Sequence, residues 1–543
     1  MKSENNKHKI LLQVLIVLSG FICSCSDKIL EEVPLSSLSA ENTLISKAGF
    51  EAYLNGLVWC AREEYSQNDN NFFITNFPGT DVGEDAGEEY YTYRNWISYL
   101  TPNTPEVSTN WVWAYTKMIP LANNIIVYAD KPELAGIWTN EAEKNAVIAE
   151  ARFFRGYTYN FLANLYGGVP IVDMVLNSPK YDYVRTTRDE VYRFAKSDLE
   201  FASTWLPTAV SQKGHIVKAA ADHLLTEVNI SLGLYDDAIV SASNVINSGI
   251  YHLMEDRFGN ALNQPGDVFS DLFQNGNFNS NDNKEAIYVW QIDPLTPGGG
   301  GSVGGNQSIR NCGPFLTKIV APDGYANIAT DILGRGVGRV RGTVYSLYTI
   351  WDDPNDIRNS EHNMRRTFYY NNPASSYYEQ EIDQSTLTAE DTLRRLYVYP
   401  RKIEGVPWNN NNTSGQISDD VYVYRLSETY LLRAEAYFRS NQLQRAADDI
   451  NTVRQRAKAT PIQANQVTLD YILDERAREL LFEEPRRRTL IRMSLLVERV
   501  KKYGLMENWR STIQDYQGLW PIPQSAIDAN LGSVLEQNPG YAK

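Results

Sequence analysis

Hydrophobic positions spaced like one face of a helix stand out between Arg425 and Ala457. Apolar or small residues recur there three and four positions apart, which is the period of an α-helix that packs on one side. Ser440 and Asn441 interrupt the pattern, and asparagine tolerates the left-handed backbone that follows many helices. This stretch therefore predicts two antiparallel helices joined by a tight turn.

The same pattern occurs a second time, far away in the sequence. Residues 226–238 align with residues 434–446 without a gap. Gly233 then falls on Asn441, and both residue types accept a positive φ at a turn. Both hairpins look like the tetratricopeptide type, in which a lone hairpin cannot bury its apolar face. We therefore expect the two copies to pack side by side, with the segment between them leaving the stack and returning.

Further helices are predicted from the same period. They cover residues 43–62, 111–128, 141–165, 188–206 and several stretches between 419 and about 502. Pro120 is expected to kink or break its helix, and Gly167 with Gly168 to stop the next one. The chain is therefore predicted to be mainly α-helical.

Helical spacing is lost between Tyr251 and Asp419, where Gly, Asn, Pro and Asp dominate. Residues 286–292 and 366–370 are predicted to be extended. Residues 297–306 are predicted to form a flexible loop. A glycine-rich loop can hold phosphate, but no Lys-Ser or Lys-Thr pair follows this one. We expect a large, irregular, loop-rich insertion with a few short strands.

The first residues predict export. Three lysines precede an almost unbroken apolar run over residues 10–22, which is shorter than the roughly 20 residues of a membrane-spanning helix. The small residues before Cys25 resemble a bacterial lipobox, so Cys25 is the predicted lipid-carrying residue. Cys23 fits less well because Ile22 precedes it directly. The alternative is an ordinary signal peptide that is cleaved without lipidation.

These patterns divide the chain into five parts. We predict a signal peptide over 1–24, a flexible tether over 25–46, a helical region over 47–251, the loop-rich insertion over 252–418 and a second helical region over 419–543. The predicted fold class is mainly α, with stacked tetratricopeptide-like hairpins as a scaffold for the insertion.

Charge and motifs exclude several functions. The chain carries 51 Lys and Arg against 66 Asp and Glu, a net charge of −15, which argues against binding nucleic acid. No HExxH or CxxC motif occurs, and the five histidines are scattered. We therefore predict no catalytic site, no metal site and no cofactor, and the need for a structural Ca²⁺ is left open. Cys60 and Cys312 remain after processing, and we do not favour a disulfide between them.

Aromatic residues make up 12% of the chain, and many lie in polar segments without helical spacing. Residues 68–109 mix such rings with acidic side chains, a combination that suits sugars, since these have an apolar C–H face and hydroxyl edges. The alternative is a structural loop whose rings pack against the helices. The candidate ligand-binding residues are Tyr93, Trp96, Trp290, Arg310, Tyr325 and Trp408.

Several segments resemble the SusD/RagB family of nutrient-binding outer-membrane lipoproteins. AEARFFRGYTYNFLANLYGGVPIV (149–172) resembles its first signature helix, and ILDERARELLFEEPRR (472–487) resembles its Glu-Arg-x-x-Glu-Leu helix. Residues 216–218 depart from the usual Arg-Ala of the family. Further matching segments follow in the family's order at 214–225, 343–360, 423–438, 450–457 and 519–541.

The resemblance implies a role as well as a fold. Members of this family sit over a SusC-like TonB-dependent outer-membrane transporter and capture oligosaccharides, or peptides in the RagB branch. We therefore expect a lipid-anchored protein that faces the cell exterior and binds an oligosaccharide. Peptide capture is the alternative, and a glycan-active enzyme is a more distant one. The family's sugar contacts come from variable loops, so the resemblance assigns no binding residue.

Overall fold

The computed structural model describes residues 39–66, 72–87, 89, 91–301, 303–330 and 334–541. The predicted signal peptide, Cys25 and most of the predicted tether lie outside these residues. Leu44 is fully buried, so the packed part of the chain begins before the predicted boundary at residue 47.

The first helical region contains the predicted helices and also short ones that the sequence did not indicate, at residues 40–43, 72–76 and 96–99. Its helices are α2 (Ala40–Thr43), α3 (Lys47–Ser66), α4 (Phe72–Asn76), α5 (Trp96–Tyr99), α6 (Pro105–Trp113), α7 (Ile119–Ala129), α8 (Glu141–Tyr166), α9 (Arg188–Trp205), α10 (Lys218–Ser231) and α11 (Tyr235–Ile246). The α8 helix begins where Asn140 accepts a hydrogen bond from the Glu143 amide and ends at Gly167, whose φ is +78°. Pro120 stands in the first turn of α7. The irregular part of this helical run comes before the proline, where residues Ala114–Met118 form a π-helical turn.

The two predicted hairpins are both present. The first is α10 with α11, and the second is α14 (Leu426–Arg439) with α15 (Leu443–Arg456). At the turns, Gly233 has a φ of +73° and Asn441 a φ of +61°. Both residues therefore hold the left-handed conformation that the alignment predicts for them.

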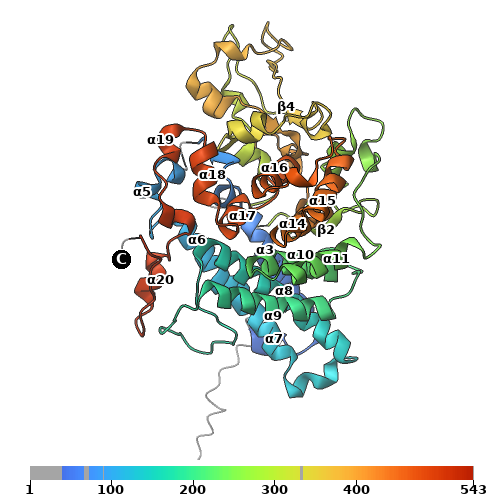
Figure 1. The fold of residues 1–543 in the computed structure, drawn as a ribbon, viewed down its shortest axis with the longest axis vertical. Coiled ribbons are helices and arrows are strands. Elements are labelled where there is room, and N and C mark those ends of the chain that lie inside the picture. Colours follow the sequence, from blue (N-terminus) through green and yellow to red (C-terminus); the bar gives the residue numbers. More distant parts are fainter. Residues whose placement is uncertain are drawn as a thin grey trace, which may run out of the picture.

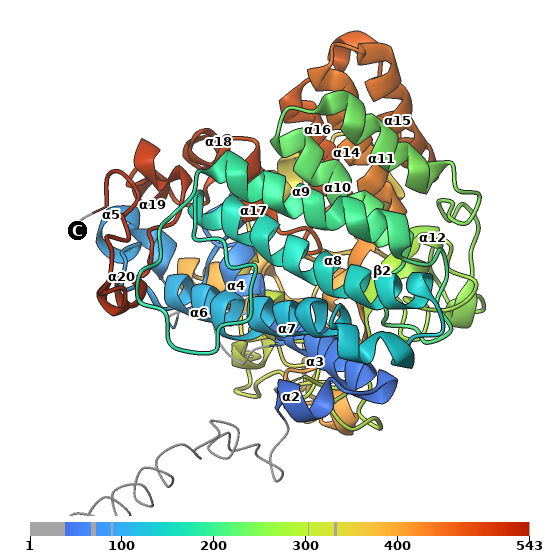
Figure 2. The same cartoon turned by 90° about the horizontal axis from the view of Figure 1, so that it is seen from below.

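The two hairpins pack against each other through small residues. Ala238 on α11 and Ala436 on α14 are fully buried, and they share a cluster with Ile230 and Leu432. Figure 2 shows α7, α8, α9, α10, α11 and α14 lying side by side, and each makes contact with the next. The predicted stack of helical hairpins is confirmed.

The insertion is built from short elements, as predicted. Its strands form three two-stranded antiparallel sheets: β1 (Gly83–Asp85) with β3 (Val340–Gly342), β2 (Ala286–Trp290) with β6 (Val421–Arg425), and β4 (Met364–Arg365) with β5 (Tyr399–Pro400). Its α-helices are α12 (Val268–Leu272) and α13 (Ser308–Cys312). Two of the sheets join the insertion to segments outside it, because β1 and β6 lie beyond its predicted bounds.

The last helices close the chain against the first ones. They are α16 (Leu469–Leu480), α17 (Arg486–Arg492), α18 (Leu496–Tyr503), α19 (Glu507–Arg510) and α20 (Gln524–Ala529). In Figure 1, α19 and α20 lie near α5 and α6 at one side, and β4 lies in the upper part of the molecule. No helix in the described part of the chain combines the length and apolar character that crossing a membrane requires. Cys60 and Cys312 are buried free thiols.

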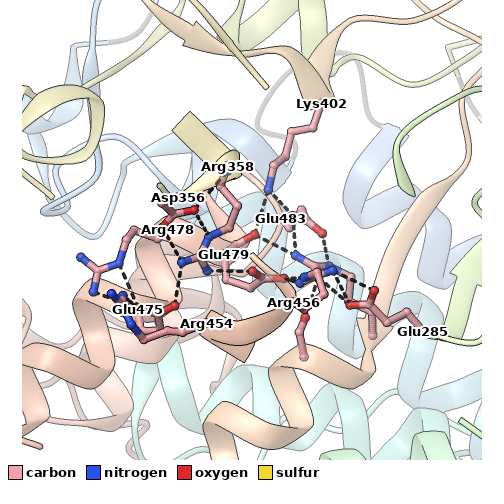
Figure 3. Close-up of polar contacts among 12 residues, drawn as sticks. Glu285, Asp356, Arg358, Lys402, Arg454, Arg456, Glu475, Arg478, Glu479 and Glu483 are labelled. Atoms are coloured by element: carbon pink, nitrogen blue, oxygen red, sulfur yellow. Dashed lines mark hydrogen bonds and ion pairs between the residues drawn. The ribbon is translucent and has the colours of Figure 1, made fainter. Parts of the chain in front are cut away.

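A buried network of charges holds the insertion to α16 (Figure 3). Glu479 binds Arg358 of the insertion (2.9 Å), Arg425 at the end of β6 and Arg456 at the end of α15. Glu475 lies one turn earlier on the same face. Burial alone would raise the pKa of Glu475, but neighbouring arginines, Arg358 first, outweigh it and lower this pKa to about 2. The Glu-Arg-x-x-Glu-Leu segment is thus structural.

Candidate ligand-binding site

Trp408 lies on a turn that is joined at its base to the glycine-rich loop. Pro407 before it and Asn306 at the end of that loop both pair with Ile417 in antiparallel bridges. The Trp408 side chain is partly exposed. No other aromatic ring in the described part of the chain stacks on it. Its indole is therefore partly covered by the protein and partly exposed.

The glycines of residues 297–306 explain how the indole is held. A β-carbon on Gly300 would lie 2.6 Å from Cη2 of Trp408, and one on Gly304 would lie 2.9 Å from Nε1. One on Gly305 would lie 3.1 Å from Cε3. These contacts spread across the whole ring system, so glycine backbone covers the ring where side chains would not fit. The loop that the sequence predicts is present, and its glycines make room for an indole.

Arg310 lies at the other end of the same turn. Its Nη1 donates to the carbonyl oxygen of Ser414 at 3.1 Å, and its Cβ and Cγ approach Gly415. Between Trp408 and Ser414, the side chains of residues 409–411 are exposed. The first two of these asparagines have φ values of +53° and +58°, which asparagine adopts more readily than most residues. The turn thus presents several amide groups beside one aromatic ring.

The segment that carries this turn is fixed at both ends. Before the turn, Lys402 binds the carboxylate of Glu483 and donates to the carbonyl oxygen of Glu479 at 3.0 Å. After it, Arg425 binds the other carboxylate oxygen of Glu483 at 2.7 Å. Figure 3 shows Lys402 reaching down to Glu483. Burial lowers the pKa of Lys402 to about 8 despite this carboxylate. The buried network therefore positions the Trp408 turn.

A ring beside amides can bind one class of ligand well. An aromatic face accepts the C–H face of a sugar ring, and amide groups both donate to and accept from hydroxyls. Arg310 adds a planar donor at the edge of the turn. No group of three or more His, Cys, Asp or Glu side chains in the described ranges could hold a metal ion.

Tyr93 and Trp96 were predicted to contact a ligand, but both are buried core residues. Both are 1% exposed, their ring centroids lie 4.8 Å apart, and Arg487 lies over Tyr93 at 4.0 Å. The nearby Glu84 and Asp85 are also buried, and burial raises their pKa values to about 8 and about 7. A buried ring has no face for a sugar, so we withdraw both rings from the predicted site.

Trp290 is likewise part of the core. It ends strand β2 with 4% exposure, its indole nitrogen donates to the Tyr288 hydroxyl at 3.1 Å, and its ring meets the edge of Tyr65. The strand that the sequence predicts is present, and its pairing with β6 turns this ring inward. Trp290 is withdrawn for the same reason as Tyr93 and Trp96.

Tyr325 is 46% exposed but lies on a different pair of loops from Trp408. Asn372 donates to the carbonyl oxygen of Ala326 at 2.8 Å, which joins the Tyr325 loop to a second tyrosine-rich segment. That segment exposes Tyr369 (51%) and Tyr378 (44%). These two rings are not among the predicted residues, although paired tyrosines in a polar stretch signal them. Trp408, Arg310 and Tyr325 stay predicted ligand contacts.

Comparisons with known proteins agree with this architecture. A sequence model of the SusD family matches residues 335–541, and one described as "Starch-binding associating with outer membrane" matches residues 30–229. The two matches do not overlap and together span most of the chain. The chain belongs to the SusD/RagB family.

Individual relatives in this family match over nearly the full length. "SusD-like protein P2" of Formosa agariphila is 26% identical over 98% of this chain and 100% of its own. A SusD homolog of Bacteroides thetaiotaomicron has the same fold, with a TM-score of 0.72 at 20% identity over 95% of this chain and 100% of that one. "Surface glycan-binding protein A" of Bacteroides fluxus has a TM-score of 0.68 at 19% identity, covering 91% of this chain and 100% of that one.

Proposed function

We propose that this SusD/RagB protein binds an oligosaccharide noncatalytically, with the ligand lying on the Trp408 turn. The carrying observation is a partly exposed indole that rests on glycine backbone next to three exposed asparagines. The named functions of the relatives support a glycan, since one structural neighbour is a surface glycan-binding protein. A ring with adjacent amides suits a sugar better than an extended peptide, which would need a free strand edge or a groove.

The cellular setting is also a proposal. We place the protein at the outer membrane, anchored through acyl chains on Cys25, because one matching family model is described as associating with that membrane. One acyl chain holds a protein weakly and two or more hold it stably. From there the protein would deliver its ligand to a SusC-like TonB-dependent transporter, the partner that the family resemblance implies.

A glycan array with the mature protein tests this function. Wild type is expected to bind one class of glycan, and Trp408→Ala to lose that signal. The matched control is Trp59→Ala, which removes another partly exposed tryptophan, on α3. If wild type binds no glycan but binds peptides on a parallel peptide array, the proposed ligand class is wrong.

A further inference from the structure

A cavity lined by both polar and apolar groups opens beside the Trp408 turn. It has a volume of about 220 Å³ and lies between the end of α12, the chain around His362 and the segment leading to Trp408. Val406 lines it and is 45% exposed. Only Pro407 stands between Val406 and Trp408 along the chain, so their Cα atoms lie within about 7 Å of each other. The cavity and the turn that carries Trp408 are therefore neighbours along the chain.

Asp419 is the buried anchor of this cavity. It is 2% exposed, and its Oδ1 accepts hydrogen bonds from the Asn275 side chain at 2.8 Å and the Val406 amide at 3.3 Å. Its other oxygen, Oδ2, receives no hydrogen bond from any residue in the described ranges. Oδ2 faces Gly405, where a β-carbon would lie only 2.4 Å away. Glycine at this position makes room for the carboxyl group of Asp419, which lines the cavity.

Other polar groups converge on the same space. The rings and amides of His362, Gln274 and Asn275 line the cavity. The His362 ring makes no hydrogen bond within the part of the chain that is described, and the Asn275 amide oxygen is also unused there. By contrast, Lys402 directs its ammonium group away, toward Glu483. The groups left for a ligand are thus mainly acceptors, together with an imidazole.

This set of groups suits hydroxyls better than ions. Burial raises the pKa of Asp419 to about 7, so the carboxyl can accept or donate near neutral pH. Sugar hydroxyls do both as well. An anionic ligand would meet the carboxylate, and the nearby cations Lys402 and Arg401 already bind Glu483 and Glu404.

The volume of the cavity limits the size of the ligand. At about 30 Å³ per molecule, the space is roughly that of seven waters, which is enough for one sugar ring and too little for a chain. Phe273 supplies an apolar wall. A single ring could enter the cavity while the rest of a chain passes over the neighbouring indole.

We propose that this cavity binds the terminal sugar of an oligosaccharide whose next residues lie on Trp408. The inference rests on the proposed glycan-binding function and adds to it that the protein recognises a chain end. If the protein recognises chain ends, one protein molecule should bind per chain end, whatever the length of the glycan chain. If it bound the middle of a chain instead, the number of protein molecules bound per chain should rise with chain length.

Calorimetry on the mature protein tests the inference with a panel of hexasaccharides of the gluco-, manno-, galacto- and xylo- series. Gln274 is exposed at the rim, so Gln274→Trp should block the cavity without disturbing the core and weaken binding about tenfold or more. His362→Ala should weaken it in the same direction. The matched control is Glu361→Ala, an exposed neighbour of His362 outside the cavity, which should stay within twofold of wild type.

The outcomes separate the two proposals. Unchanged affinity in both Gln274→Trp and His362→Ala, with wild type binding normally, would overturn the end-recognising cavity and leave glycan binding intact. A stoichiometry that rises with chain length, measured with the polymer of the same series, would also overturn it. Failure of wild type to bind any hexasaccharide would contradict the proposed function itself.

Discussion

Gly300 lies so close to Trp408 that a β-carbon on the glycine would be 2.6 Å from Cη2 of the indole. This contact makes the glycine-rich loop part of the predicted site. Gly300→Ala should push the ring out of place and cost about 1–3 kcal/mol of overpacking, with weaker glycan binding as the readout. Gly298→Ala is the control, because a β-carbon there meets nothing within 4 Å. Gly298 has a φ of +77°, so this variant introduces backbone strain in the same loop but no contact with the indole. Equal binding by the two variants would mean that the contact does not orient the ring.

The hairpin contact gives a prediction about stability. Ala238 and Ala446 are fully buried, so Ala238→Leu and Ala446→Leu should each lower the free energy of unfolding by roughly 1–3 kcal/mol. Val240 on the same helix as Ala238 is 60% exposed, and Val240→Leu should change it by less than about 0.5 kcal/mol. Thermal and denaturant unfolding measure the difference. An unchanged free energy of unfolding in both Ala238→Leu and Ala446→Leu would contradict the packing of the hairpins.

Much of the helical scaffold could be predicted from the sequence because its signals are local. Gly233 and Asn441 mark their turns through residue type and spacing alone. The burial of Trp96 and Tyr93 could not be predicted in this way. Their partner Arg487 lies hundreds of residues away in the sequence, and only the folded chain brings it over the Tyr93 ring. The polar residues around them indicate a surface loop, but Glu84 and Asp85 are buried with the rings.

Which of the candidate rings are exposed could be predicted only in part, for a related reason. Trp408 and Trp290 both lie in segments without helical spacing, and the sequence does not distinguish them. The pairing of β2 with β6 turns Trp290 into the core, whereas the turn after Pro407 leaves Trp408 partly exposed. The cavity at Asp419 was not predicted, since its walls come from three segments far apart in the chain.

The charge network should make the free energy of unfolding depend on pH. The pKa of Glu475 falls from its ordinary 4.5 to about 2 on folding. Between these two pKa values the folded state keeps the carboxylate charged, whereas the unfolded state takes up a proton. The contribution of Glu475 to the free energy of unfolding is therefore fully present above about pH 4.5 and is lost as pH falls toward 2. Because the raised pKa values of Glu84 and Asp85 change stability in the opposite direction, the test compares wild type with Glu475→Gln by chemical denaturation between pH 7 and 3. The stability difference between the two proteins should shrink as pH falls, and a difference that does not change with pH would contradict the network.

Removing one partner of the network gives a separate prediction. Glu479→Gln leaves Arg425 and Arg456 without their shared carboxylate, and breaking a buried pair in this way costs about 3–5 kcal/mol. Glu498→Gln on the exposed face of α18 is the control and should be nearly neutral. Denaturant unfolding at neutral pH compares the two variants, and equal stability would show that the network contributes little.

The proposed anchor can be tested in cells. Cys25→Ala should release the protein from the membrane fraction, because the acyl chains would have no attachment site. Cys23→Ala is the matched control and should leave the protein anchored. Recovery of Cys25→Ala with membranes after a salt wash would rule out Cys25 as the lipid-carrying residue.

The central claim is that an oligosaccharide binds on the indole of Trp408, and calorimetry with the glycan identified on the array tests it most directly. Truncating a stacking ring in a small site costs about 2 kcal/mol or more, so Trp408→Ala should bind roughly thirtyfold more weakly than wild type. Circular dichroism should show an unchanged helical spectrum. Binding within twofold of wild type by a correctly folded Trp408→Ala would contradict the claim.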